Sequence, residues 1–244
     1  MLSSKFIEIL KGNYMHLNTF EFDFCGFNTK GDKYTDNCNT VILHGAGKSS
    51  RTRFKKMRDN LNKKGLPSMS FDFIGHGETE GKMSDSSLEK RFEQAKIAIK
   101  QQAPKFSILI GSSMSAYTAI KLTEIFPIEN LILMVPAVYT PQAYNLDFGP
   151  DFSKAIRVQN SWLDSDAFSI LKNFKGNLLI IAAQNDNVIP YEVLEKIYNS
   201  ATDANTKKLH IIPNAEHLNL FPEECDFDLA INQIRNMIDS SSLQ

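Results

Sequence analysis

Short apolar runs alternate with longer amphipathic segments through most of this chain. Each run is apolar nearly throughout, which is typical of strands that are buried on both faces of a parallel sheet. The runs are Val41–Leu43, Met69–Phe73, Ser107–Ile110, Leu131–Val135, Leu178–Ala183 and Leu209–Ile212. We therefore predict that these six segments are strands of one sheet.

Five segments between and after these runs have helical periodicity. In the first of them, Phe54, Met57, Arg58 and Leu61 recur at spacings of three and four residues, so one face is largely apolar. The segments are Arg51–Lys64, Ser87–Gln101, Met114–Phe126, Tyr191–Ser200 and roughly Asp226–Ile238. Alternating strands and helices predict an α/β fold with helices on both sides of a mostly parallel sheet.

Two parts of the chain depart from this alternation. Phe6–Leu10 and Thr19–Phe24 both resemble strands and have no helix between them, so we expect an antiparallel start to the sheet. The interval Tyr139–Lys175 combines aromatic residues with Pro and Gly and predicts a short cap over the strand ends. Since no repeat or linker interrupts the pattern, we expect residues 1–244 to form one domain, with a cap insertion at about 139–175.

Composition narrows the classes of partner. The chain has 244 residues, of which 42% are hydrophobic, and a net charge of −1, so a large core is available and no basic surplus favours nucleic acid. Its three cysteines have neither CxxC nor zinc-site spacing and suit a reducing compartment. With no signal-peptide pattern and no apolar run of about 18 residues, we expect a cytoplasmic protein without an integral membrane segment.

A serine between two small residues is the first candidate for chemistry. Ser113 follows a predicted strand and precedes a predicted helix, with Gly111 and Ser115 two residues away on either side. A nucleophile on such a sharp turn requires small neighbours at these two positions, because the strand and helix backbones approach closely. Alone, the pentapeptide is a weak pattern that more often marks an ordinary loop, and its placement between a buried strand and a helix is what favours a nucleophile.

An aspartate and a histidine follow two later strands. Asp186 follows Leu178–Ala183, although alone it would be interpreted as a turn residue before a helix. His217 follows the last predicted strand, and a histidine can accept and return a proton near neutral pH. The carboxyl ends of parallel strands share one edge of the sheet, so we predict that Ser113, Asp186 and His217 meet there. Their order along the chain is that of a nucleophile, an orienting acid and a base.

A glycine-rich turn after the first parallel strand reaches the same edge. The backbone N–H groups of Ala46, in this turn, and of Met114, just after Ser113, are candidate donors to an oxyanion. The sequence Gly45-Ala46-Gly47-Lys48-Ser49 also suggests a phosphate-binding loop, but that motif needs a glycine five residues before Gly47, where Ile42 lies. The phosphate-binding interpretation therefore fails.

Taken together, these motifs resemble the α/β-hydrolase superfamily over roughly residues 40–238. The matching segments are His44–Gly47, Asp72–Gly81, Gly111–Ser115, Asp186–Pro190 and His217. The resemblance implies a three-layer fold with an eight-stranded, mostly parallel sheet, a Ser113–His217–Asp186 triad and neither a cofactor nor a metal. It is nearest to small bacterial esterases, thioesterases and lysophospholipase-like members. Ser115 departs from it, because glycine is usual at that position.

The resulting hypothesis is hydrolysis of a small acyl ester or thioester through an acyl-enzyme on Ser113. Candidate substrate-binding residues are His44, Tyr139 and Trp162, although the cap aromatics are equally consistent with a core of the cap itself. A peptidase, an amidase and a C–C bond hydrolase use the same triad and stay open as alternatives. So does a catalytically silent binding protein of the same fold. The sequence does not indicate the natural substrate or the oligomeric state.

Overall fold

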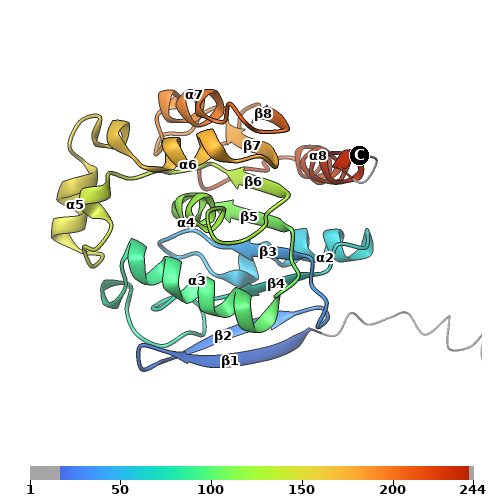
Figure 1. Cartoon of the computed structure of the whole chain (residues 1–244), viewed down its shortest axis with the longest axis horizontal. Coiled ribbons are helices and arrows are strands. Elements are labelled where there is room, and N and C mark those ends of the chain that lie inside the picture. The colour runs from blue at the N-terminus through green and yellow to red at the C-terminus, as the bar shows by residue number, and fades with distance from the viewer. Residues whose placement is uncertain (1–16, 242–244) are drawn as a thin grey trace, which may run out of the picture.

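A single mixed sheet organises the residues that the structure, a computed structural model, describes, which are 17–241 (Figure 1). Eight strands in this range are ordered β1-β2-β4-β3-β5-β6-β7-β8. Their bounds are β1 Asn18–Phe24, β2 Phe27–Lys33, β3 Thr40–Leu43, β4 Ser68–Phe71, β5 Ile108–Ser112, β6 Asn130–Met134, β7 Asn177–Ala183 and β8 Thr206–Ile212. Strands β3 to β8 pair in parallel, and β2 is antiparallel to both its neighbours. The expectation of an eight-stranded, mostly parallel sheet is confirmed.

Successive side chains of the central strands enter two different cores. Val41 and Leu43 pack into one core with helices α3, α4, α6 and α7, while Ile42 packs into the other with α2 and α8. The helix bounds are α2 Lys55–Lys63, α3 Leu88–Gln102, α4 Met114–Leu122, α5 Pro150–Ile156, α6 Ala167–Asn173, α7 Tyr191–Ser200 and α8 Glu224–Ser241. Because both faces are covered, the central strands β5, β6 and β7 are largely apolar, which is the pattern found in the sequence.

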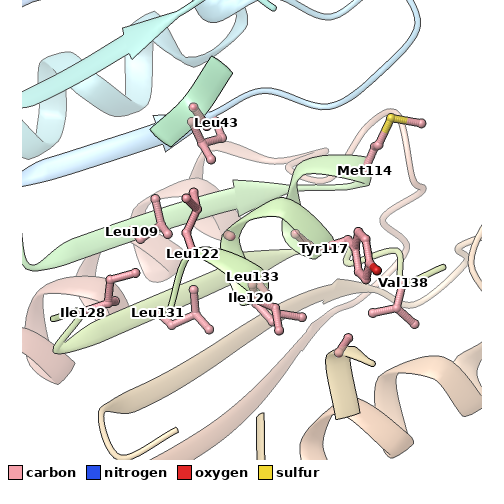
Figure 2. Packing of buried hydrophobic residues seen from close by; sticks show 14 of the residues in the cluster. Leu43, Leu109, Met114, Tyr117, Ile120, Leu122, Ile128, Leu131, Leu133 and Val138 are labelled. Carbon is pink, nitrogen blue, oxygen red and sulfur yellow. The ribbon is translucent and has the colours of Figure 1, made fainter. Parts of the chain in front are cut away.

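The first of these cores lies between the sheet and α4. Figure 2 shows Leu109, Leu131 and Leu133 of the sheet facing Tyr117 and Ile120 of α4. All five residues are buried. This packing fixes the start of α4, and with it the turn that carries Ser113, against the centre of the sheet.

The antiparallel start of the sheet is present, and it includes a strand, β2, that the sequence pattern did not predict. Strand β1 pairs with β2, joined by a turn in which Cys25 and Gly26 both have positive φ, and the expected strand Phe6–Leu10 lies outside the described residues. Strand β2 has the sequence FNTKGDK, which contains one apolar residue and therefore gave no strand signal. It lies between β1 and β4, and backbone pairing on both sides holds it in the sheet.

Residues 139–175, which the sequence predicts to be a cap, contain α5, α6 and short 3-10 turns between β6 and β7, and their role as a cap stays a prediction. In Figure 1, α5 lies beyond the carboxyl ends of the central strands. Within the described residues no helix is both long and apolar enough to cross a membrane.

Candidate active site

Ser113 sits on a strained turn between β5 and α4. Its φ is 51° and its ψ is −119°, values that residues with a side chain rarely adopt outside functional turns. The turn brings strand and helix so close that a Cβ on Gly111 would lie 2.5 Å from the carbonyl oxygen of Ser115. The glycine at position 111 is therefore required by the crossing of the two backbones.

Asp186 and His217 reach Ser113 from the ends of β7 and β8. The Oγ of Ser113 lies 3.0 Å from Nε2 of His217, and Nδ1 of His217 lies 2.8 Å from Oδ2 of Asp186. The histidine and aspartate side chains are only 7% and 5% exposed. The structure thus brings the three predicted residues together as one hydrogen-bonded chain, in which Nδ1–H of His217 donates to the carboxylate and leaves Nε2 to accept from Ser113.

The carboxylate of Asp186 is held in its charged form. Burial acts to raise its pKa, but hydrogen bonds from His217 and from the backbone N–H groups of Ile189 and Val188 outweigh burial, so the pKa lies below its ordinary value. Both backbone donors lie 2.9 Å from Oδ1. Asp186 therefore remains an acceptor near neutral pH and can fix the tautomer of His217.

The glycine-rich turn lies directly beside Ser113. A Cβ on Gly45 would lie 3.1 Å from the Cβ of Ser113, and Ala46 lines the same 90 Å³ pocket as Ser113 and His217. Met114 begins α4 immediately after Ser113. Both residues expected to provide oxyanion donors are thus near the serine, and their roles stay predictions.

The structure does not bring the side chain of His44 to this pocket, which corrects the expectation that it binds substrate. The ring is fully buried, with Nδ1 at 2.7 Å from the carbonyl oxygen of Gly45 and Nε2 accepting from the N–H of Phe73 at 3.1 Å. Both ring nitrogens are used inside the protein. Burial holds the pKa of His44 well below its ordinary value, with a smaller effect from the charge of Arg91.

The other two candidate substrate-binding residues line a neighbouring pocket. Tyr139 and Trp162 contribute to a cavity of 170 Å³ between the cap and the segment after Asp186, together with Val188 and Ile189. Neither residue lines the 90 Å³ pocket at Ser113. Val188 and Ile189 line this cavity and also donate their backbone N–H groups to Asp186, so the cavity adjoins the triad segment.

Sequence reasoning missed several residues that line the pocket at Ser113. Arg53 projects from the segment before α2 and donates to the carbonyl oxygen of Leu218, and Ser49 and Val135 complete the wall. A larger pocket of 310 Å³ between α2 and α8 shares Arg53 and Leu218 with it. The helical periodicity around Arg53 carried no signal for this role, since an exposed arginine on an amphipathic segment is ordinary. Among the described residues, no three His, Cys, Asp or Glu side chains cluster as metal ligands would.

The family of the chain follows from a comparison with family models. The model of Hydrolase_4, described as serine aminopeptidase S33, matches residues 37–164, which is more than half of the chain. The chain belongs to this family. The expected membership of the α/β-hydrolase superfamily is thereby confirmed.

The curated proteins that resemble this chain either have low sequence identity to it or match only part of it. "Putative esterase/lipase 2" of Mycoplasma genitalium is 32% identical over 108 residues, which cover 43% of this chain and 40% of that protein. The uncharacterised Escherichia coli protein YfhR is 21% identical over 202 residues, covering 77% of this chain and 66% of its own length. The matches thus span less than two thirds of either relative.

Solved structures of low sequence identity share the fold of this hydrolase-family chain. Est1E from Butyrivibrio proteoclasticus, solved with ferulic acid bound, has a TM-score of 0.72 at 16% identity and covers 92% of this chain and 100% of its own. The Pyrococcus furiosus esterase PF2001 has a TM-score of 0.65 at 17% identity, with coverage of 93% and 91%. The thioesterase domain of the curacin pathway has a TM-score of 0.67 at 13% identity, with coverage of 91% and 99%.

Proposed function

We propose that this protein is a serine hydrolase that cleaves a carboxylic ester or thioester through an acyl-enzyme on Ser113. The observation that carries the proposal is the hydrogen-bonded chain from Ser113 through His217 to Asp186. It opens on a pocket beside the glycine-rich turn. The names of three similar proteins, an esterase/lipase, an esterase and a thioesterase domain, point in the same direction.

The proposed reaction follows from these positions. Nε2 of His217 accepts the hydroxyl proton as Oγ of Ser113 attacks the carbonyl carbon, and the N–H groups of Ala46 and Met114 stabilise the oxyanion. His217 then returns the proton to the departing alcohol or thiol, which leaves the acyl group on Ser113. A water molecule, deprotonated by His217, attacks this acyl group and releases the acid.

The lining of the site favours an uncharged or anionic ester over the substrate of an aminopeptidase. An aminopeptidase must hold a protonated amine, for which a carboxylate is the natural partner. Within the described residues, the lining of the 90 Å³ pocket at Ser113 contains the cation Arg53 and no carboxylate, and the carboxylates of Glu223 and Glu224 line only the adjoining 310 Å³ pocket between α2 and α8. Leu218 and Val188, directly beyond the triad segments, are 74% and 56% exposed and give the site an apolar rim. We therefore also propose an apolar acyl or aryl group, with Tyr139 and Trp162 as contacts for it.

Covalent labelling tests the nucleophile. A fluorophosphonate probe should label the wild-type protein and not Ser113→Ala, as read by intact mass and by the mass of the modified peptide. Ser112→Ala is the matched control, because it removes the adjacent hydroxyl and leaves Ser113 in place. Labelling of Ser113→Ala at the wild-type rate, or no labelling of the wild type, would exclude the mechanism.

Turnover tests the reaction class. We expect hydrolysis of p-nitrophenyl esters and acyl thioesters to exceed that of aminoacyl p-nitroanilides, and to fall by at least about 1,000-fold in Ser113→Ala. Faster cleavage of the anilides would favour an aminopeptidase. A wild-type protein without any turnover would favour the silent binding protein.

A further inference from the structure

A buried arginine lies beneath the glycine-rich turn without an ionic partner. Arg91 of α3 is 0% exposed, and its Nε and Nη1 atoms have no hydrogen-bond partner among the described residues. No carboxylate in the described part of the chain forms an ion pair with it. The centroid of the Phe73 ring lies 3.7 Å from the guanidinium carbon, a cation–π contact that offsets only part of the cost of burying the charge. Leaving a cation in such surroundings is unfavourable, because burial disfavours the charged form.

The hydrogen bonds that Arg91 does form all lead to the candidate active site. Its Nη2 donates to the carbonyl oxygen of His44 at 2.7 Å, to that of Gly45 at 3.3 Å and to Oγ of Ser115 at 2.8 Å. The hydroxyl of Ser115 in turn donates to the carbonyl oxygen of His44 at 2.6 Å. One guanidinium group therefore joins the turn after β3 to the first residues of the nucleophile helix α4.

One of these carbonyl groups belongs to the peptide that carries the candidate oxyanion donor. The C=O of Gly45 and the N–H of Ala46 are the two ends of a single planar peptide and point in opposite directions. Arg91 and Nδ1 of His44 both lie within hydrogen-bonding distance of the carbonyl end, below the turn. Fixing that end fixes the direction of the Ala46 N–H on the other side, and a hydrogen bond to the carbonyl also polarises the N–H.

We propose that Arg91 is a positioning residue for the oxyanion hole of this site. It orients the Gly45–Ala46 peptide toward Ser113, and its buried charge favours the negatively charged transition state over the neutral ester. The proposal rests on the proposed function. Burial lowers the pKa of Arg91 to about 9, which still leaves the side chain charged at neutral pH. Because Arg91 itself is fully buried, its charge is screened less by water than the charge of a surface arginine.

Steady-state kinetics of three variants on a p-nitrophenyl ester test the proposal. Arg91→Met keeps most of the side-chain volume and removes the charge and the donors, and we expect kcat to fall about 10- to 100-fold with KM changed by less than about threefold. Arg91→Lys restores the charge and should recover part of the lost kcat. Lys100→Met, on the exposed end of α3, is the matched control and should leave kcat unchanged.

A transition-state analogue separates positioning from a merely structural role. A trifluoromethyl ketone, which forms a negatively charged adduct with the serine, should lose affinity in Arg91→Met by the same factor as kcat. A neutral, non-hydrolysable analogue of the ester, which cannot form the adduct, should bind as tightly as before. Equal losses for both ligands, or an unchanged kcat, would overturn the proposal while leaving the Ser113 mechanism intact.

A second pair of variants applies if Arg91→Met does not fold. Arg91→Lys keeps the charge and Arg91→Gln does not, so a kcat of Arg91→Lys no higher than that of a folded Arg91→Gln would also overturn the proposal. Absence of turnover and labelling in the wild type would instead reject the proposed function and this inference with it.

Discussion

Two buried arginines near the same edge of the sheet have opposite surroundings. Arg51, at the start of the segment before α2, forms ion pairs with Asp32, Asp72 and Glu78. Arg91 has only carbonyl oxygens and a hydroxyl as hydrogen-bond partners among the described residues, and no ion pair. Burial acts to lower the pKa of both, but the carboxylates around Arg51 reverse its effect and raise the pKa, whereas the pKa of Arg91 falls to about 9. The comparison separates a charge that is compensated and holds the fold together from one that is left uncompensated at the candidate site.

The largest expected effect is the loss of stability when the compensated arginine is removed. In Arg51→Met the carboxylate of Asp72, which is fully buried, loses its ion pair. We expect the free energy of unfolding to fall by about 3–5 kcal/mol, measured by urea denaturation at pH 7. Arg91→Met should lose less, because removing an uncompensated charge offsets part of the lost hydrogen bonding. If Arg91→Met loses as much free energy of unfolding as Arg51→Met, or more, the contrast between a compensated and an uncompensated arginine is wrong.

Two glycines, one beside each arginine, sharpen the same contrast. Gly77 has φ of +54°, and a Cβ there would lie 2.2 Å from Oδ2 of Asp72. We expect Gly77→Ala to lower the free energy of unfolding by about 1–3 kcal/mol and to leave kcat within a few-fold of wild type. Gly45→Ala places its Cβ against Ser113 and should mainly lower kcat, with a smaller change in stability. Urea denaturation and ester turnover of both variants check this prediction, and the reverse assignment of the two effects would contradict it.

Most of the fold was predictable because its strands are buried on both faces. The runs around Val41–Leu43 and Leu178–Ala183 are apolar for this reason, and the structure has β3 and β7 there. The same topology explains why Ser113, Asp186 and His217 could be grouped, since each follows a strand whose carboxyl end lies at one edge. The polar strand β2 could not be found, because its place in the sheet depends on backbone pairing with β1 and β4.

The residues around the site were harder to predict because their surroundings come from distant segments. His44 follows a strand in a glycine-rich turn, and the local pattern is the same whether its ring faces a pocket or the interior. The backbone N–H of Phe73, 29 residues away, donates to the ring of His44 and holds it in the interior. Arg91 lies on an amphipathic helix, where a charged residue normally indicates a solvent-facing position, and its carbonyl partners are 46 and 47 residues away.

Acid should weaken the fold through two histidines, His44 and His76, that burial keeps neutral. Burial is the main cause that lowers the pKa of His44 and of His76 from the ordinary 6.5, and the charge of Arg91 adds to it. The unfolded chain then binds protons that the folded chain does not, so stability is present above about pH 6.5 and is lost as the pH falls below that value. We expect a slope of about 1.4 kcal/mol per pH unit for each histidine that stays neutral in the folded state.

Urea denaturation between about pH 7.5 and 5.5 measures this slope above the titration range of ordinary carboxylates. His44→Gln removes one of the two groups and should flatten the slope. Arg91→Met should flatten it less than His44→Gln does, because burial, the larger cause of the lowered pKa values, stays in place when the neighbouring charge is gone. A slope in His44→Gln as steep as that of the wild type would mean that His44 is not kept neutral by its surroundings.

The smallest expected effect is that of the hydroxyl at position 115, where the family pattern has glycine. Ser115 only supplements Arg91: without its Oγ, the guanidinium still reaches the carbonyl oxygens of His44 and Gly45. Ser115→Ala should therefore cost about 1 kcal/mol of stability and lower kcat by no more than about fivefold, less than Arg91→Met. Because the two side chains share one network, the double variant should lose less activity than the product of the single losses. A loss in Ser115→Ala as large as that in Arg91→Met would mean that the hydroxyl, rather than the buried charge, holds the turn in place.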